Sequence, residues 1–172
     1  MLTGVSSLVV LLTSIAVFGF MLLEARRAAA NEAAQTARGG VEPRGDVYKM
    51  MRVAYPAAFL AMIVEGAVRG PVPAAALAAG ATLFAAAKAL KWWAILTLGR
   101  AWTFRVIVVP GMPLIVHGPY RYLRHPNYVG VAGELVGVAL MTGALVTGPI
   151  ATIGFGALML KRIAVEQRAL GV

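Results

Sequence analysis

The polar segment with the most chemical potential covers residues 118–134 and reads GPYRYLRHPNYVGVAGE. Pro126 suits the first position of a helix, so a helix is predicted to begin there. Its unpaired N–H groups and the positive end of its dipole then lie beside Arg124 and His125, where they suit an anionic or nucleotide-like ligand. The alternative is that Arg121 and Arg124 contact lipid phosphates, as basic residues beside membrane helices often do.

Three charged side chains toward the end of the chain form a second candidate group. Arg162 and Glu166 are four residues apart and share one face of the last predicted helix. The last two predicted helices form a hairpin about Gly148, and equal distances from this turn place Glu134 level with Arg162. Glu134 is therefore a candidate general base, with Arg162 as a second candidate functional residue at the same depth. The alternative is a buried ion pair that serves only the fold.

Both groups must be positioned by a membrane-embedded frame. Hydrophobic residues make up 60% of the 172 residues and charged residues only 13%, which is typical of an integral membrane protein. Without a long polar block, the chain is predicted to form one domain over residues 1–172, an all-α bundle. The sequence has no cysteine and only two histidines, so a metal site is not expected.

Apolar runs of membrane-spanning length predict five helices, at about residues 2–23, 51–69, 72–98, 127–146 and 149–164. Residues 24–49 are predicted to form a short helix and a turn, and residues 98–118 an irregular segment, because of their prolines and glycines. The fifth apolar run is short, so Lys161 and Arg162 must reach toward the interface or face a protein-lined cavity.

The basic residues are distributed unevenly between the two predicted membrane faces. Of the 16 lysines and arginines, all but Arg69 fall on one face, which predicts a cytoplasmic location for that face. The N-terminus is then outside and the C-terminus inside. The net charge of +9 borders hydrophobic spans, so a nucleic-acid partner is not expected.

The two candidate groups resemble the sequence pattern of the isoprenylcysteine carboxyl methyltransferase family, GxYxxxRHPxYxG followed by a later RxxxE. The first element is present as Gly118, Tyr120, Arg124, His125, Pro126, Tyr128 and Gly130. The second element is present as Arg162 and Glu166. Two separated motifs over roughly residues 90–170 are far more specific than RHPNY alone.

This resemblance implies S-adenosylmethionine as the methyl donor and a cofactor-site region at about residues 98–172, on the cytoplasmic side. Arg162 matches the family's substrate-side arginine. The donor-binding residues implied are Pro113, Leu114, Ile115, Tyr120, His125, Pro126, Asn127, Tyr128 and Glu166.

The acceptor is less well defined by the resemblance. Glu166 is followed by Gln167 where relatives often carry a second acid, and the chain ends at Val172 without the longer polar tail of the eukaryotic prenylcysteine enzymes. Residues 98–128 resemble a bacterial branch that methylates long-chain alkylpyrones and alkylresorcinols. We therefore expect an O-methyltransferase of a bacterial cytoplasmic membrane, with a lipophilic phenol or pyrone as acceptor and lipid as its surroundings.

Other functions remain open at this point. Within methyl transfer, the acceptor alternatives are a protein prenylcysteine carboxylate and a phospholipid amine. Membrane sterol reductases, which use NADPH, have a related RHPNY segment followed by a Gly-Glu pair, here the looser GVAGE. A noncatalytic membrane scaffold is the third class.

Overall fold

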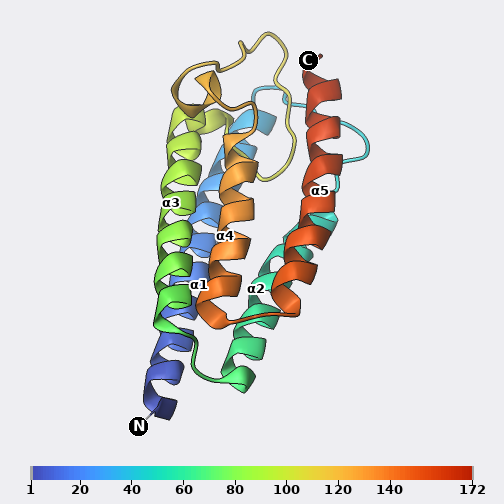
Figure 1. Cartoon of the computed structure of the whole chain (residues 1–172). Coiled ribbons are helices and arrows are strands. Elements are labelled where there is room, and N and C mark those ends of the chain that lie inside the picture. The colour runs from blue at the N-terminus through green and yellow to red at the C-terminus, as the bar shows by residue number, and fades with distance from the viewer. Residues whose placement is uncertain (1, 172) are drawn as a thin grey trace.

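The computed structural model describes residues 2–171, with side chains from residue 7 onward. Figure 1 shows the helices running alongside one another, with the two termini at opposite ends of the bundle. Two short 3₁₀ helices, η1 (Gly99–Ala101) and η2 (Gly118–Arg121), lie in the connection before α4. The α-helices of the described residues are α1 (Leu2–Thr36), α2 (Tyr48–Arg69), α3 (Ala74–Leu98), α4 (Pro126–Thr142) and α5 (Thr147–Leu170).

The architecture confirms an integral membrane bundle of about five helices. Among the described residues, α1, α2, α3 and α5 are long and apolar enough to cross a membrane. The 17-residue α4 is shorter and lies within the bundle, and it forms the expected hairpin with α5 (Figure 1). The bundle therefore holds α4, which carries Pro126, Asn127, Tyr128 and Glu134 of the candidate residues, among longer spans.

Three of the predicted helix boundaries were wrong by four residues or more. The fourth helix ends at Thr142 and not near residue 146. The first helix does not stop near residue 23, because α1 continues to Thr36, through the part of residues 24–49 that was predicted to form a separate short helix. The added residues are rich in alanine, glutamate and arginine, which are strong helix formers. The last helix continues beyond residue 164 to Leu170, so Arg162 and Glu166 both lie within α5.

Glycines bring α3 and α4 into close contact. A Cβ on Gly137 would lie 2.9 Å from the backbone nitrogen of Phe84, and a Cβ on Gly130 would lie 2.9 Å from the Cβ of Lys91. Small residues of this kind let membrane helices approach closely. The contact brings the polar side chains of α3 against those of α4.

A buried charge cluster joins four of the helices. Lys88 and Lys91 of α3 lie 2.9 and 2.7 Å from the carboxylate oxygens of Glu24 on α1. The same lysines lie 3.1 and 3.4 Å from Glu134 of α4, which also accepts a hydrogen bond from the hydroxyl of Tyr55 on α2. Two carboxylates thus balance two ammonium groups. This balance matters because unpaired charges inside a membrane are strongly unfavourable.

The opposite end of the bundle is fixed by Glu65 of α2. Its carboxylate accepts hydrogen bonds from the backbone N–H groups of Val146 and Thr147 at 3.1 and 2.7 Å, and from the Thr147 hydroxyl at 2.6 Å. An acidic side chain at this position satisfies free N–H groups and interacts favourably with the helix dipole. Glu65 therefore fixes the start of α5 relative to α2.

The charge cluster predicts that Glu134→Gln destabilises the fold. The substitution leaves two buried ammonium groups with one carboxylate, and breaking a buried ion pair from one side typically lowers the free energy of unfolding by about 3–5 kcal/mol. The measurement is the unfolding transition of the protein in detergent. The matched control is Glu42→Gln, since Glu42 is exposed and its ion pair with Arg105 should contribute little.

The double variant Glu134→Gln/Lys88→Met separates charge from shape. It restores neutrality, so it should recover part of the lost stability. The account of the cluster is contradicted if Glu134→Gln unfolds at the same point as Glu42→Gln.

Candidate active site

The candidate site lies at the end of the bundle where the chain ends. The irregular connection before α4 covers the ends of α3 and α4 here, and the loop between α1 and α2 reaches toward α5 (Figure 1). Val41 and Val108 join these two segments through a pair of backbone hydrogen bonds of 2.9 and 3.0 Å. The site is therefore bounded by two helix ends and two connected loops.

The turn into α4 has the predicted geometry. Pro126 occupies the first turn of the helix and His125 is its N-cap residue. The His125 side chain makes no capping hydrogen bond, while its carbonyl accepts from the backbone N–H groups of Tyr128 and Val129. The imidazole is thus held at the positive end of the helix dipole and is not used as a cap.

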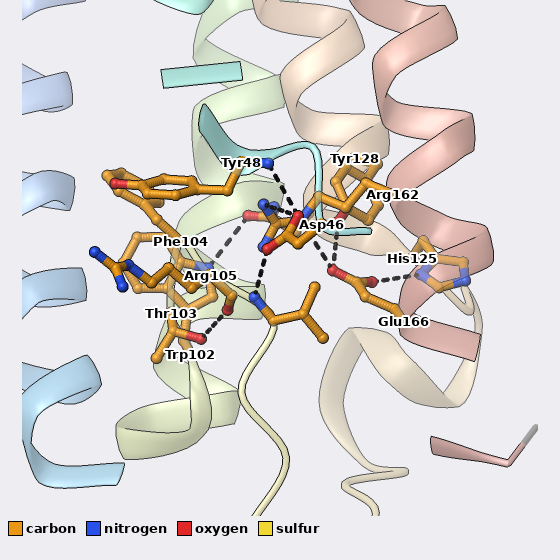
Figure 2. A network of polar contacts seen from close by, with 12 residues as sticks. Asp46, Tyr48, Trp102, Thr103, Phe104, Arg105, His125, Tyr128, Arg162 and Glu166 are labelled. Atoms are coloured by element: carbon orange, nitrogen blue, oxygen red, sulfur yellow. Dashed lines mark hydrogen bonds and ion pairs between the residues drawn. The ribbon is translucent and has the colours of Figure 1, made fainter. Parts of the chain in front are cut away.

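Glu166 brings the two separated motifs together (Figure 2). Its carboxylate accepts a hydrogen bond from the Tyr128 hydroxyl of α4. It also lies 3.7 Å from Nδ1 of His125 and 3.3 Å from Nε of Arg162. The side chains of His125 and Glu166 are about a quarter exposed, at 25% and 24%, so this carboxylate is accessible to a ligand from outside the bundle.

Arg162 is nearly buried and has two acidic partners. Its side chain is 6% exposed, and Nη1 lies 3.5 Å from Oδ1 of Asp46, which belongs to the loop between α1 and α2. Sequence reasoning missed Asp46, because an acid in a loop of mixed charge carries no signal of its own. Lys161 and Arg162 were expected either to reach toward the interface or to face a protein-lined cavity. Arg162 is surrounded by protein, whereas Lys161 is exposed.

Asn127 is held by Trp102, whose segment is in turn held by the C-terminal part of α1. Nε1 of the buried Trp102 donates to Oδ1 of Asn127 at 3.4 Å. The side chain of Asn31 on α1 donates to the carbonyls of Gly99 and Trp102 at 3.0 and 2.7 Å. Glu32, on the next position of α1, accepts from the backbone N–H groups of residues 104 and 105. The part of α1 beyond its predicted end thus positions the connection between α3 and α4, residues 99–125, which we call the covering segment.

Tyr120 lies in η2, just ahead of these residues. Burial raises the pKa of its phenol above the ordinary value, and the negative charge of Glu166 raises it further. The phenol therefore stays protonated and remains a hydrogen-bond donor or an aromatic surface. Gly118 at the start of η2 has φ +60°, and a Cβ there would lie 2.6 Å from Oγ1 of Thr97, so this turn requires glycine.

Not every residue of the predicted set joins the hydrogen-bonded group. Pro113 and Leu114 are exposed and Ile115 is half-buried, and all three lie on the irregular connection before η2. Their proposed contact with a donor stays a prediction. Among residues 2–171, no group of three or more acidic, histidine or cysteine side chains is placed to hold a metal ion.

The predicted pairing of Glu134 with Arg162 was wrong. Glu134 belongs to the charge cluster with Lys88 and Lys91, whereas the ion pairs described for Arg162 are with Asp46 and Glu166. The count was made from Gly148, but α4 ends at Thr142 and Gly148 already lies in α5, so the turn is earlier and the predicted depth of Glu134 was too close to that of Arg162. The close contact between α3 and α4 turns Glu134 toward the lysines.

Two bacterial proteins are similar to this chain over most of its length. The chain is 29% identical over 140 residues to the uncharacterized protein YpbQ of Bacillus subtilis (strain 168), covering 81% of this chain and 83% of that protein. It is 23% identical over 141 residues to an uncharacterized protein of Haemophilus influenzae, covering 81% and 82%. No solved structure matches the chain.

The family comparison covers the region that contains the site. Residues 80–171 match the isoprenylcysteine carboxyl methyltransferase (ICMT) family. This range includes η2, α4 and α5, and with them the residues that meet at Glu166. Since the match spans more than half of the chain, the protein belongs to the isoprenylcysteine carboxyl methyltransferase family of membrane methyltransferases.

Proposed function

We propose that the protein is an S-adenosylmethionine-dependent O-methyltransferase that acts on a lipophilic acceptor, a long-chain phenol or pyrone, at the membrane. Family membership supports methyl transfer. The observation that carries the proposal is the convergence on Glu166 of Tyr128, His125 and Arg162, which come from two motifs separated along the chain.

The residues present suit this donor chemically. With His125 neutral, Asp46, Glu166 and Arg162 together carry a formal charge of −1, which complements a donor with a sulfonium and an ammonium group and one carboxylate. Glu166 can accept from the ammonium or the ribose hydroxyls, and His125 at the start of α4 can hold the carboxylate. When bound, the donor supplies a methyl group on a positively charged sulfur.

The tyrosines and the covering segment complete the proposed donor site. Tyr120 and Tyr128 present aromatic rings that can face the sulfonium or stack on adenine. Asn127 is held in place by Trp102 and offers a polar group beside the start of α4. Residues 113–115 are assigned to the donor site on the family resemblance alone.

An apolar groove between α2 and α5 supports a lipophilic acceptor. The groove has a volume of about 270 Å³ and is lined on α5 by Ile150, Gly154 and Leu158, among others. These residues recur every four positions, and the next position in the series is Arg162. A hydrocarbon tail in this groove would place a polar head group at the guanidinium.

Arg162 then explains acceptor activation better than Glu134 does. A guanidinium favours the ionised form of a phenol or enol, whose proton can pass to water at the membrane surface, and the resulting oxyanion is a better nucleophile toward a sulfonium methyl than the neutral hydroxyl is. Glu134, predicted as a general base, lies instead in the buried charge cluster with Lys88, Lys91 and the Tyr55 hydroxyl as its partners, so it is not placed beside an acceptor held by Arg162. We assign the remaining acceleration to alignment of acceptor and methyl group, which proximity can supply.

The positive charge of Arg162 also distinguishes between the other candidate acceptors. An anionic oxygen suits a guanidinium, so a prenylcysteine carboxylate is the second candidate and a phospholipid amine is disfavoured. The nicotinamide-dependent reductase is disfavoured by the family match. Charge distribution supports a cytoplasmic site, because the basic face is the one on which the C-terminus lies.

Donor binding tests the proposal. His125→Ala and Glu166→Ala each remove a polar partner, so each should weaken S-adenosylmethionine binding by about 1–3 kcal/mol. The measurement is equilibrium binding of labelled S-adenosylmethionine to the detergent-purified protein, with NADPH as the competing candidate. Lys161→Ala is the control, since Lys161 is exposed on the same helix. Normal binding by both folded variants, or tight binding of NADPH instead, would exclude the assignment.

Orientation is tested independently with topology reporters. A reporter fused after residue 172 should report a cytoplasmic location, and a reporter at Gly148 should report the opposite side. Fusions after Arg44 and Gly70 extend the test to the two other loops and should be cytoplasmic and external, respectively. Equal cytoplasmic signals at residues 148 and 172 would contradict the α4–α5 hairpin as a membrane-crossing pair.

A further inference from the structure

Asp46 lies outside the residues matched by the family, in the loop that joins α1 to α2. Its side chain is 10% exposed. Oδ1 accepts from the backbone N–H of Tyr48 at 3.0 Å, and Oδ2 accepts from the backbone N–H of Val106 at 3.0 Å. Figure 2 shows the carboxylate between these segments and Arg162. Two backbone N–H groups from different parts of the chain therefore hold the Asp46 carboxylate in place independently of Arg162.

The guanidinium of Arg162 is held from two edges. Nη1 pairs with Asp46 at 3.5 Å, and Nε pairs with Glu166 at 3.3 Å. A guanidinium is planar and carries five N–H donors in fixed directions. Fixing two of its nitrogens therefore sets the direction of the third, Nη2, which takes part in neither ion pair.

The two acidic partners are not equivalent. Glu166 also accepts from Tyr128 and lies near His125, and in the proposed function it binds the donor as well. Asp46 has no contact described with Tyr128 or His125, and its remaining bonds are to backbone N–H groups. Asp46 is thus the partner that can keep Arg162 in place while Glu166 engages a donor.

We propose that Asp46 is a positioning residue for Arg162 and that it thereby determines how the acceptor is oriented. This inference rests on the proposed function, in which Arg162 holds the acceptor oxygen. It assigns part of the acceptor site to the loop between α1 and α2, which the family match does not cover.

The surrounding contacts make the inference testable, because the loop has other anchors. Val41 and Val108 are joined by two backbone hydrogen bonds. The side chain of Gln35, at the end of α1 where the loop begins, donates to the carbonyl of Arg100 at 2.9 Å. Loss of the Asp46 charge should therefore leave the loop attached to the covering segment.

The test compares Asp46→Asn with the wild type and with Glu42→Gln as the matched loop control. Asparagine keeps the size and a carbonyl oxygen but removes the charge facing Arg162. The first measurement is the side-chain ¹⁵N–¹H spectrum of Arg162 in detergent micelles, assigned with Arg162→Lys. The Arg162 signals should shift in Asp46→Asn and stay unchanged in Glu42→Gln. Unchanged Arg162 signals in Asp46→Asn would overturn the inference.

The second measurement is methyl transfer from labelled S-adenosylmethionine to a long-chain alkylresorcinol in mixed micelles. Loss of the ion pair should misalign the guanidinium and lower kcat/KM for the acceptor by about 10- to 100-fold, because small displacements of a positioning group can cost that much in rate. The Kd for S-adenosylmethionine should stay within about twofold of the wild-type value, and Asp46→Glu should recover part of the activity. An equal loss of donor affinity and activity would show a general structural role and overturn the inference.

The two measurements also separate this inference from the proposed function. If the wild type binds S-adenosylmethionine but does not methylate the alkylresorcinol, the proposed acceptor class is wrong. The Arg162 signals then still decide whether Asp46 positions the guanidinium.

Discussion

Charges inside a membrane bundle must be paired with one another, and this constraint organises the protein. It is met in two ways. The cluster of Glu24, Lys88, Lys91 and Glu134 is neutral and closed, with side chains that are 1–8% exposed. The group around Glu166 has an excess of acid and is partly open. The first arrangement suits a structural role and the second suits binding of a cation.

The closed cluster holds the helices in place, so that the side chains of the open group around Glu166 have fixed relative positions. It joins α1, α2, α3 and α4, and the contact of Glu65 with the start of α5 connects the remaining helix to α2. The helices that supply His125, Tyr128 and Arg162 are thereby held at fixed relative positions. A site assembled from two helix ends and two loops needs such a frame, because small displacements greatly weaken catalysis.

Sequence reasoning succeeded where a local rule determines the structure. Pro126 marked the start of α4, and the spacing of Arg162 and Glu166 placed them on one face. The hairpin of the last two helices was also predicted, although its turn precedes Thr147 and is not centred on Gly148. It failed for the partners of Glu134. The count from Gly148 misjudged the depth of Glu134, because the turn comes earlier in the chain. The choice of the lysines as its partners depends on the close packing of α3 against α4.

The roles of Asp46 and of the C-terminal part of α1 could not be predicted from the sequence either. Both act through contacts with backbone groups of residues 99–106, and an irregular segment gives no periodic pattern from which such contacts can be inferred. The family match begins at residue 80, so it gives no information about these elements. Only the three-dimensional structure shows the contacts of these elements with the site.

The most direct test of the account is transfer of a labelled methyl group. The protein, reconstituted in lipid vesicles that contain a long-chain alkylresorcinol, is incubated with methyl-labelled S-adenosylmethionine, and the solvent-extractable lipids are analysed. The account predicts label in the alkylresorcinol as a methyl ether, and at least severalfold less label with Glu166→Ala at a donor concentration below the wild-type Kd. Label that stays entirely in the aqueous donor, or product formation that is unaffected by Glu166→Ala, would contradict it.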